Sequence, residues 1–155
     1  MSQTPASSHE GNPVEGQNIW SLLFPGEFQQ GEPCSMALIT AIKKGLPGAA
    51  IGEIARIFDL NKNQIYSLLH LKPKTAQRAG ARSSLSLDTS DHIVQLVKLF
   101  IRCTELFGSR TKASLWLTTP NHTLGGELPL QFMDTIEGIS LVHDTVTRVE
   151  YGVFS

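Results

Sequence analysis

Residues 118–138, TTPNHTLGGELPLQFMDTIEG, contain the residue types that catalysis or phosphate binding would need: a histidine, a glycine pair and three carboxylates. His122 has no nearby cysteine or serine partner with which to form a nucleophilic pair. The segment LGGELP lacks the Lys-Ser/Thr of a phosphate-binding loop. Asp134 and Glu137 are spaced as the N-cap and N3 residues of a helix. The pattern therefore argues against an enzyme.

The histidines and cysteines form no metal or redox motif. None of the five histidines has another four residues away, and Cys34 and Cys103 are far apart in sequence. We expect no metal, no cofactor and two reduced cysteines that are buried or partly buried, as in a cytosolic protein.

The same stretch is better explained as a stiff corner between helices. Pro120 ends one helix, and Gly125 and Gly126 permit backbone angles that other residues avoid. Pro129 suits the first turn of the next helix.

Positive charge is concentrated in the middle of the chain. Residues 1–48 carry two basic and four acidic side chains, residues 49–82 carry six and two, and residues 83–155 carry five and eight. The net charges of −2, +4 and −3 sum to the −1 of the whole chain. A basic middle between acidic flanks is typical of a localised nucleic-acid footprint.

This basic segment fits a helix-turn-helix frame that starts at Ile51. Ala55 takes the small-residue position, Asp59 takes the turn position usually held by glycine, and Ile65 pins the second helix. The second helix would then present four side chains outward, with groups suited to base edges and phosphates: Lys62, Asn63, Gln64 and Tyr66.

A later frame is also open, with IYSLLHL as the supporting helix and KPKTAQRA as the recognition helix. Packing disfavours this frame, because the large Tyr66 would hold the small-residue position. Charge favours it, because its recognition helix is more basic. In either frame residues 62–82 form the expected DNA-binding face. The later frame adds Lys72, Lys74, Thr75, Gln77, Arg78 and Arg82.

The remaining patterns predict helices throughout. We expect helices from Ser35 to Gly45, from about Thr89 to Phe107 with Ser86 or Asp88 as N-cap, and from about Asp134 to Tyr151. No segment alternates as a strand does, so the fold class is all-α. The helix at 89–107 is apolar on more than one side, which predicts packing against a partner chain as well as its own core.

The N-terminal residues 1–18 are rich in Ser, Pro, Gly, Asn and Gln and predict a flexible tail. They lack the basic start and apolar run of a signal peptide, and the most hydrophobic stretch of the chain contains Lys98, Arg102 and Glu105. These observations favour a cytoplasmic protein.

The C-terminal segment resembles the toxin-binding domain of the Xre/ParS (MbcA-like) antitoxins. The resemblance depends on a Trp-Leu helix at Trp116, a Pro-Asn…Leu-Gly-Gly…Pro-Leu corner, an Asp-Thr at 134–135 and a Tyr-Gly-Val ending at 151–153. Residues 46–82 are similar to the family's Xre-like helix-turn-helix module. They depart from its Arg-Thr-Leu-x-Arg-Arg at residues 74–79, which bears on DNA affinity or site choice.

The resemblance implies an Xre-like DNA-binding domain at 19–82 and a toxin-binding and dimerisation domain at 83–155. It further implies a non-catalytic antitoxin that neutralises a RES-domain, NAD⁺-degrading toxin and represses its own operon as a homodimer within a larger complex. The expected toxin contacts are Trp116, Asn121, Leu124, Gly125, Gly126, Arg148, Glu150, Tyr151, Gly152, Val153, Phe154 and Ser155. The alternative is a stand-alone transcriptional regulator whose C-terminal domain serves dimerisation or binds a ligand.

Overall fold

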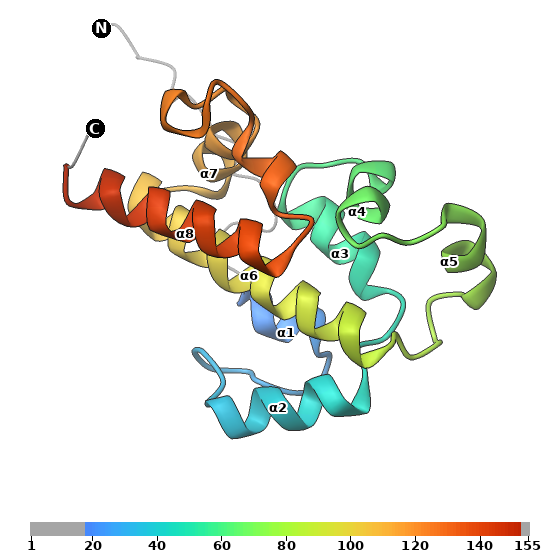
Figure 1. Ribbon diagram of the computed structural model, residues 1–155. Helices are drawn as coiled ribbons and strands as arrows, with labels where there is room; N and C mark the ends of the chain where they lie inside the picture. The colour runs from blue at the N-terminus through green and yellow to red at the C-terminus, as the bar shows by residue number, and fades with distance from the viewer. Residues whose placement is uncertain (1–17, 153–155) are drawn as a thin grey trace, which may run out of the picture.

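The computed structural model describes residues 18–152, which form helices joined by short turns (Figure 1). The described residues contain no strand, only an isolated antiparallel bridge between Pro47 and Ser84, and the all-α prediction is confirmed. The elements in chain order are α1 (Ile19–Leu23), α2 (Ser35–Lys44), α3 (Ala50–Ile57), α4 (Lys62–Leu68), α5 (Pro73–Ala79), α6 (Leu87–Phe107), α7 (Arg110–Leu117), η1 (His122–Leu124), η2 (Pro129–Phe132) and α8 (Ile136–Glu150).

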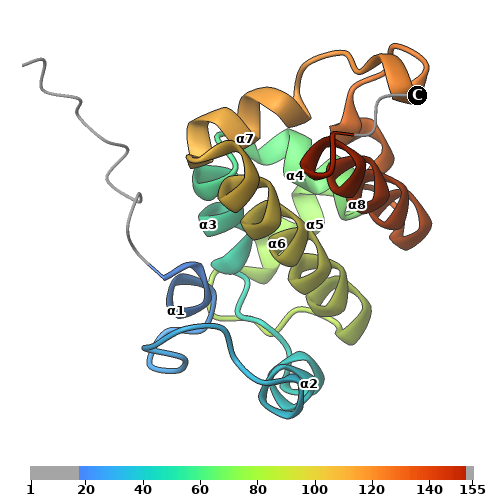
Figure 2. The same cartoon turned by 90° about the vertical axis from the view of Figure 1, so that its left-hand side faces the viewer.

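The long helix α6 forms the centre of the molecule, with α2, α7 and α8 packed around it (Figures 1 and 2). The Ser86 hydroxyl caps its first turn by accepting from the Thr89 N–H, and Gly108 ends it in the left-handed region with φ of 93°. The helix begins two residues earlier than the sequence predicts. One core formed by side chains from α1 to α8 surrounds it.

For α6, packing against a partner chain stays a prediction. Its wide apolar stripe is covered by helices of the same chain, because α2, α7 and α8 approach it from different sides. Leu87, in the first turn of α6, is 52% exposed, whereas the partly buried Ile101 and Leu106 pack against the core. The buried side chains of the stripe are Ile93, Val94, Leu96, Val97, Leu99, Phe100 and Cys103.

The start of α8 also differs from the prediction. Thr135, not Asp134, is the N-cap, and its hydroxyl accepts the Gly138 N–H at 3.0 Å. The preceding 3-10 helix η2 and its C-cap Met133 bring the backbone of Phe132 against Gly138, which shifts the first turn by one residue. Glu137 is therefore at N2, where its charge still faces the positive end of the helix dipole.

Near the N-terminus two further expectations need correction. The predicted flexible tail lies outside the described residues except for Asn18, which is held in place: its Nδ2 donates to the Phe28 and Gly31 carbonyls, and its Oδ1 caps α1. Cys34 is exposed rather than partly buried, whereas Cys103 is buried as expected. No helix in residues 18–152 is long and apolar enough to cross a membrane.

Two helical glycines give opposite predictions for alanine substitution. A Cβ at Gly138 would overlap the Phe132 carbonyl oxygen, so Gly138→Ala should lower the free energy of unfolding by about 1–3 kcal/mol. A Cβ at Gly52 would meet only the flexible end of Lys62, at 3.7 Å. Gly52→Ala should therefore raise the free energy of unfolding by up to about 1 kcal/mol. Denaturant unfolding of both variants tests this pair; equal effects would contradict the packing at Gly138.

Candidate DNA-binding and toxin-binding surfaces

Helices α3 and α4 pack on each other, as the first predicted frame requires. Asp59 adopts φ of 54°, so it takes the left-handed turn conformation for which glycine is usual. Ala55 and Ile65 are buried at the contact between the two helices, as predicted. Asn61 and Gln64 form a capping box at the start of α4, which occupies the Gln64 side-chain oxygen.

Tyr66 does not face outward as the first frame predicts. Its side chain is only 6% exposed and belongs to the hydrophobic core. In this short helix the inward face includes Ile65, Leu68 and Leu69, and Tyr66 turns towards the same interior. A buried aromatic at this position supports α4 instead of contacting DNA.

Helix α5 follows a second left-handed turn, at His70 with φ of 53°, and protrudes from the body of the molecule (Figure 1). None of its side chains is buried, although Ala76 packs partly against the core. A cleft of about 430 Å³ separates α5 from α3 and α4, and is lined mainly by glycine and alanine with Lys62, Tyr66 and Gln77. The helix is therefore presented to solvent.

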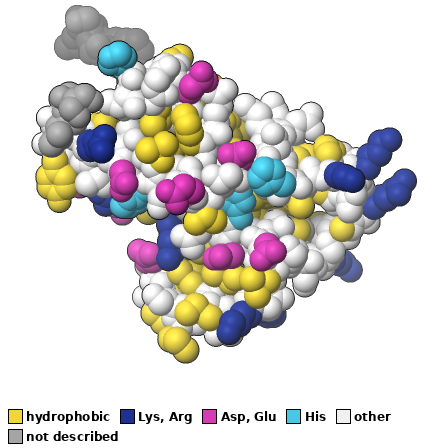
Figure 3. Space-filling model, in the orientation of Figure 1, with side chains coloured by type: hydrophobic (Ala, Val, Ile, Leu, Met, Phe, Trp, Pro, Cys, Tyr) yellow, Lys and Arg dark blue, Asp and Glu magenta, His cyan; other side chains and the backbone are white. Residues whose placement is uncertain are grey.

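Cations gather on this end of the molecule. Figure 3 shows Lys and Arg side chains along the edge occupied by α5. Lys72, Lys74, Arg78 and Arg82 form no ion pair with a carboxylate of residues 18–152. Apart from Tyr66, all the predicted DNA-binding residues are exposed: Lys62, Asn63, Gln64, Lys72, Lys74, Thr75, Gln77, Arg78 and Arg82.

The corner between α7 and η2 has the stiffness that its glycines and prolines predict. Asn121 organises it: its Oδ1 accepts from the Thr123 N–H and hydroxyl, and its backbone bonds Glu127 and Gly126. Gly125 and Gly126 both have positive φ, 70° and 83°. The resulting loop is fixed by its own hydrogen bonds, and both glycines are exposed at its surface.

Two corner residues predicted to contact a toxin serve the fold as well. Leu124 is buried, so it is unavailable to a partner while the corner keeps this conformation. Trp116 is half-buried and packs against Phe107, with ring centroids 5.3 Å apart. The exposed part of the corner is therefore provided by Gly125, Gly126 and their neighbours.

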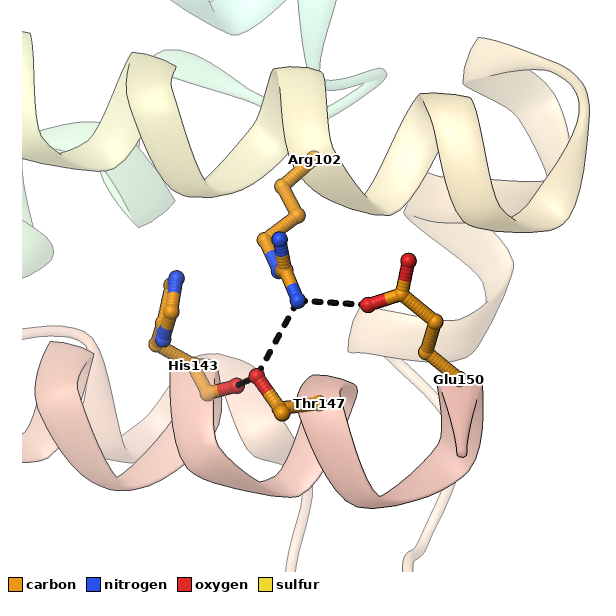
Figure 4. A network of polar contacts seen from close by, with 4 residues as sticks. All are labelled: Arg102, His143, Thr147 and Glu150. Carbon is orange, nitrogen blue, oxygen red and sulfur yellow. Dashed lines mark hydrogen bonds and ion pairs between the residues drawn. The ribbon is translucent and has the colours of Figure 1, made fainter. Parts of the chain in front are cut away.

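The C-terminal end of α8 is anchored to α6 by a polar network (Figure 4). An Arg102 guanidinium nitrogen donates to Glu150 at 2.6 Å and to the Thr147 hydroxyl at 3.1 Å. Thr147 in turn donates to the His143 carbonyl at 3.0 Å. Glu150, predicted as a toxin contact, thus has a partner in its own chain. Sequence reasoning missed Arg102, because the pair lies 48 residues apart.

The described residues next to this network are exposed to solvent. Arg148 and Gly152 are exposed, and Tyr151 is 75% exposed. The predicted contacts Val153, Phe154 and Ser155 lie outside the described residues.

Helix α8 also exposes apolar side chains that the sequence analysis did not single out. Ile136 is 55% exposed and Leu141 is 44% exposed, although the opposite face of the helix is buried. A groove of about 260 Å³ between α6 and α8 is lined by Lys98, Ile136, His143 and neighbouring residues. The helical period places Leu141, Arg148 and Tyr151 on one side of α8.

Two histidines join the helix-turn-helix half to the toxin-binding half. The Nε2 atoms of His70 and His92 donate to the carbonyls of Asp134 and Met133, at 2.8 and 2.9 Å. Because a carbonyl only accepts, both rings carry a proton on Nε2. These links span 64 and 41 residues, and no local pattern in the sequence signals them.

The described residues offer little for covalent chemistry. Burial raises the pKa of the Cys103 thiol to about 12, so the thiol stays protonated and weakly nucleophilic at neutral pH. Within residues 18–152 no group of three or more His, Cys, Asp or Glu side chains is arranged to hold a metal ion.

Comparison with known proteins matches both halves of the chain. Residues 37–98 match the model of the antitoxin Xre-like helix-turn-helix domain. Residues 103–152 match the model of the antitoxin Xre/MbcA/ParS C-terminal toxin-binding domain. The predicted boundary at 82/83 stays a prediction.

Similar proteins carry antitoxin names. An "Antitoxin Xre" of Photorhabdus laumondii is 24% identical over 98% of this chain and 97% of its own length. An "Antitoxin Xre" of Yersinia enterocolitica is 28% identical over 76% of this chain and 81% of the relative. A "Prs ADP-ribosylating antitoxin" of Sphingobium is 25% identical over 76% of this chain and 80% of the relative. The chain therefore belongs to the Xre/MbcA/ParS family of antitoxins, with the helix-turn-helix domain first and the toxin-binding domain second.

Proposed function

We propose that this antitoxin neutralises a RES-domain toxin that degrades NAD⁺ and represses its own operon by binding promoter DNA. The observation that carries the proposal is the separation of two chemically different surfaces on one folded chain. The cationic helix α5 lies at one end of the molecule, and the last turn of α8 lies at the other (Figure 1). One molecule thus has room for DNA and toxin together. Both partners would be met in the cytoplasm.

The DNA-binding half of the proposal rests on charge and exposure. Unpaired lysines and arginines at residues 62–82 are suited to phosphates, and the exposed amides of Asn63 and Gln77 are suited to base edges. The protrusion of α5 favours it as the helix that enters the major groove, with α3 and α4 behind it. The competing arrangement is the first frame, in which α4 enters the groove. The packing of α3 on α4 supports it.

The toxin-binding half rests on the apolar side chains exposed on α8 and on the rigid corner. Helix α8 and the corner segment lie on the same side of the molecule in the two views (Figures 1 and 2). Ile136, Leu141 and Tyr151 provide exposed apolar contact area, and Arg148 adds a charge on the side of Leu141 and Tyr151. We propose that the end of the chain, including Val153, Phe154 and Ser155, approaches the substrate cleft of the toxin and that the antitoxin itself is not catalytic.

The family and one relative's name support a toxin that uses NAD⁺. The Sphingobium relative is named "Prs ADP-ribosylating antitoxin", and ADP-ribosylation uses NAD⁺ as its donor. Co-expression with a RES-domain toxin should give a complex that co-purifies and a cell that keeps its NAD⁺. Growth arrest with ADP-ribosylated protein but constant total NAD⁺ would contradict NAD⁺ degradation. The neutralised reaction would then be the transfer of ADP-ribose to protein.

Replacing single cations should separate the two helix-turn-helix frames. Arg78→Ala or Lys62→Ala should weaken operator binding, and each lost phosphate contact should reduce the slope of log K against log salt by about 0.9. A larger effect of Arg78→Ala would identify α5 as the recognition helix, and a larger effect of Lys62→Ala would identify α4. The measurement is a salt titration of operator affinity.

Lys112→Ala is the matched control, because it removes the same charge from the start of α7, outside the basic segment. Unchanged operator binding by both the Arg78 and the Lys62 variants would refute the assignment of residues 62–82.

Removing residues 151–155 tests the toxin contact. The deletion should abolish or strongly reduce neutralisation, since Tyr151 is an exposed aromatic anchor. It should leave thermal stability nearly unchanged, because the Arg102–Glu150 pair is retained. Toxin affinity and the melting temperature are measured on the same sample; full neutralisation by the folded, shortened chain would contradict the proposal.

A further inference from the structure

The cleft between α5 and the α3–α4 pair is a cavity that neither proposed surface explains. Its volume of about 430 Å³ lies in the range of small-molecule sites. Backbone hydrogen bonds hold its base together. The Gly48 N–H donates to the Ser83 carbonyl at 2.7 Å, and the Ala49 N–H donates to the carbonyl of residue 81 at 3.1 Å. Away from this base, α5 stands apart from α3 and α4 (Figure 1), so the cleft is open to solvent.

Small residues give the cleft its volume. Gly52 of α3 shows how much space they leave, because a Cβ at this position would meet only the Lys62 side chain, with Cε at 3.7 Å and Nζ at 4.0 Å. The Lys62 ammonium therefore lies next to the Gly52 side of the cleft. The small lining residues are Gly48, Ala49, Gly52, Ala76, Gly80 and Ala81.

A buried tyrosine hydroxyl without a partner points to a ligand in this cleft. Tyr66 lines the cleft and is only 6% exposed, yet its hydroxyl forms no hydrogen bond with another residue of 18–152. Buried tyrosine hydroxyls usually have a partner. This hydroxyl is not sealed in the core, because the fully buried side-chain atom that lacks a partner among the described residues is Arg102 Nε. It is therefore available to a molecule in the cleft.

Two further polar side chains line the cleft, one from each wall. Lys62 is exposed and forms no ion pair with a carboxylate of residues 18–152. The exposed amide of Gln77, on α5, can both donate and accept hydrogen bonds. No carboxylate from the described part of the chain lines the cleft. The lining thus favours a ligand with negative charge and offers nothing that would repel it.

We propose that this cleft binds a small organic anion, in which a flat and mainly apolar body carries one carboxylate or phosphate group. The anionic group pairs with Lys62. The body lies between α5 and α3, where glycine and alanine allow close approach to the backbone. Hydrogen bonds to the Tyr66 hydroxyl and the Gln77 amide orient the body, in the way that a few polar groups orient ligands in mainly apolar pockets.

Occupancy of the cleft should weaken operator binding, and in this respect the inference rests on the proposed function. Lys62 and Gln77 are among the residues expected to contact DNA, and the ligand engages both side chains. The ligand also fixes α5 against α3, although α5 buries no side chain of its own. The cleft is therefore an effector site, through which a small metabolite controls repression.

Binding is measured on the full-length, ¹⁵N-labelled protein by NMR titration with adenosine monophosphate and with benzoate. Inorganic phosphate, an anion without an organic body, is the reference probe. At least one organic probe should shift the Gly52 and Gly80 amide signals and bind about tenfold more tightly than phosphate, because burial of its body adds favourable free energy. Binding of neither organic probe, equal affinity for phosphate, or shifts confined to other parts of the chain would overturn the inference.

Tyr66→Phe tests the hydroxyl, since it keeps the ring and removes only the oxygen. It should leave the free energy of unfolding without ligand unchanged, because the hydroxyl has no partner among the described residues. It should weaken probe binding about fivefold, as expected for the loss of one hydrogen bond. An unchanged probe affinity would contradict a ligand that contacts Tyr66.

Two pairs of variants test the space and the charge. Gly52→Leu should fill the cleft and abolish probe binding, whereas Gly52→Ala adds one methyl group to the same position and should retain it. Lys62→Ala should weaken probe binding about tenfold. Lys112→Ala, which removes an exposed lysine of α7, should not. Equal probe affinity in Gly52→Leu and Gly52→Ala would place the ligand elsewhere.

Operator affinity is then measured with and without saturating probe at matched ionic strength. We expect the probe to weaken operator binding about tenfold, since it removes at least one phosphate contact, and to have no effect on Gly52→Leu. An unchanged operator affinity of the saturated wild-type protein would overturn the effector role. Probe binding in the cleft of a protein that binds no operator would refute the proposed function and leave the ligand site intact.

Discussion

A helix of twenty-one residues that is apolar on more than one side has to be covered, and the rest of the chain is arranged around that requirement. Helix α6 passes through the whole molecule, and α2, α7 and α8 each bury part of its surface. Phe58 of α3 stacks on Phe100 at a centroid distance of 4.2 Å. Complete burial of a side chain of this size contributes about 2–3 kcal/mol. The matches to two family domains therefore fall on a chain with one continuous core.

Polar contacts then fix how the two halves meet. The Ser114 hydroxyl donates to the Phe58 carbonyl at 2.7 Å in a buried position, which ties α7 to the helix-turn-helix pair. His70 and His92 hold the backbone just before α8, and Arg102 holds its end. Helix α8 is thus fixed at both ends by residues of other elements. Its inner face belongs to the core, and its outer face is exposed.

The arrangement also explains how a small protein can present several surfaces. Helices α2, α7 and α8 each bury one side against α6, and the other side of each helix can carry a different chemistry. Helix α5, which buries no side chain, carries mainly charge and amide groups. Helix α8 exposes Ile136 and Leu141, and α2 exposes Met36 and Ile39. These three helices lie on different sides of the molecule (Figures 1 and 2).

The sequence by itself determined the helices, their order, the ends of α2 and α6, the stiff corner at residues 120–129 and the cationic segment. These depend on residues a few positions apart: Ser86 and Gly108 cap α6 through local hydrogen bonds and local backbone angles. Asp59 takes the predicted turn position for the same reason.

Only the tertiary structure decided which way Tyr66 and Leu124 point, that Thr135 replaces Asp134 as the cap, and what covers α6. A pattern of apolar residues shows that a face will be buried, but the identity of its neighbour depends on packing between segments far apart in the chain. The same holds for Arg102 and Glu150, whose contact spans 48 residues. Helical period places a side chain on a face, and the free energy of packing the whole core decides whether that face meets protein or water.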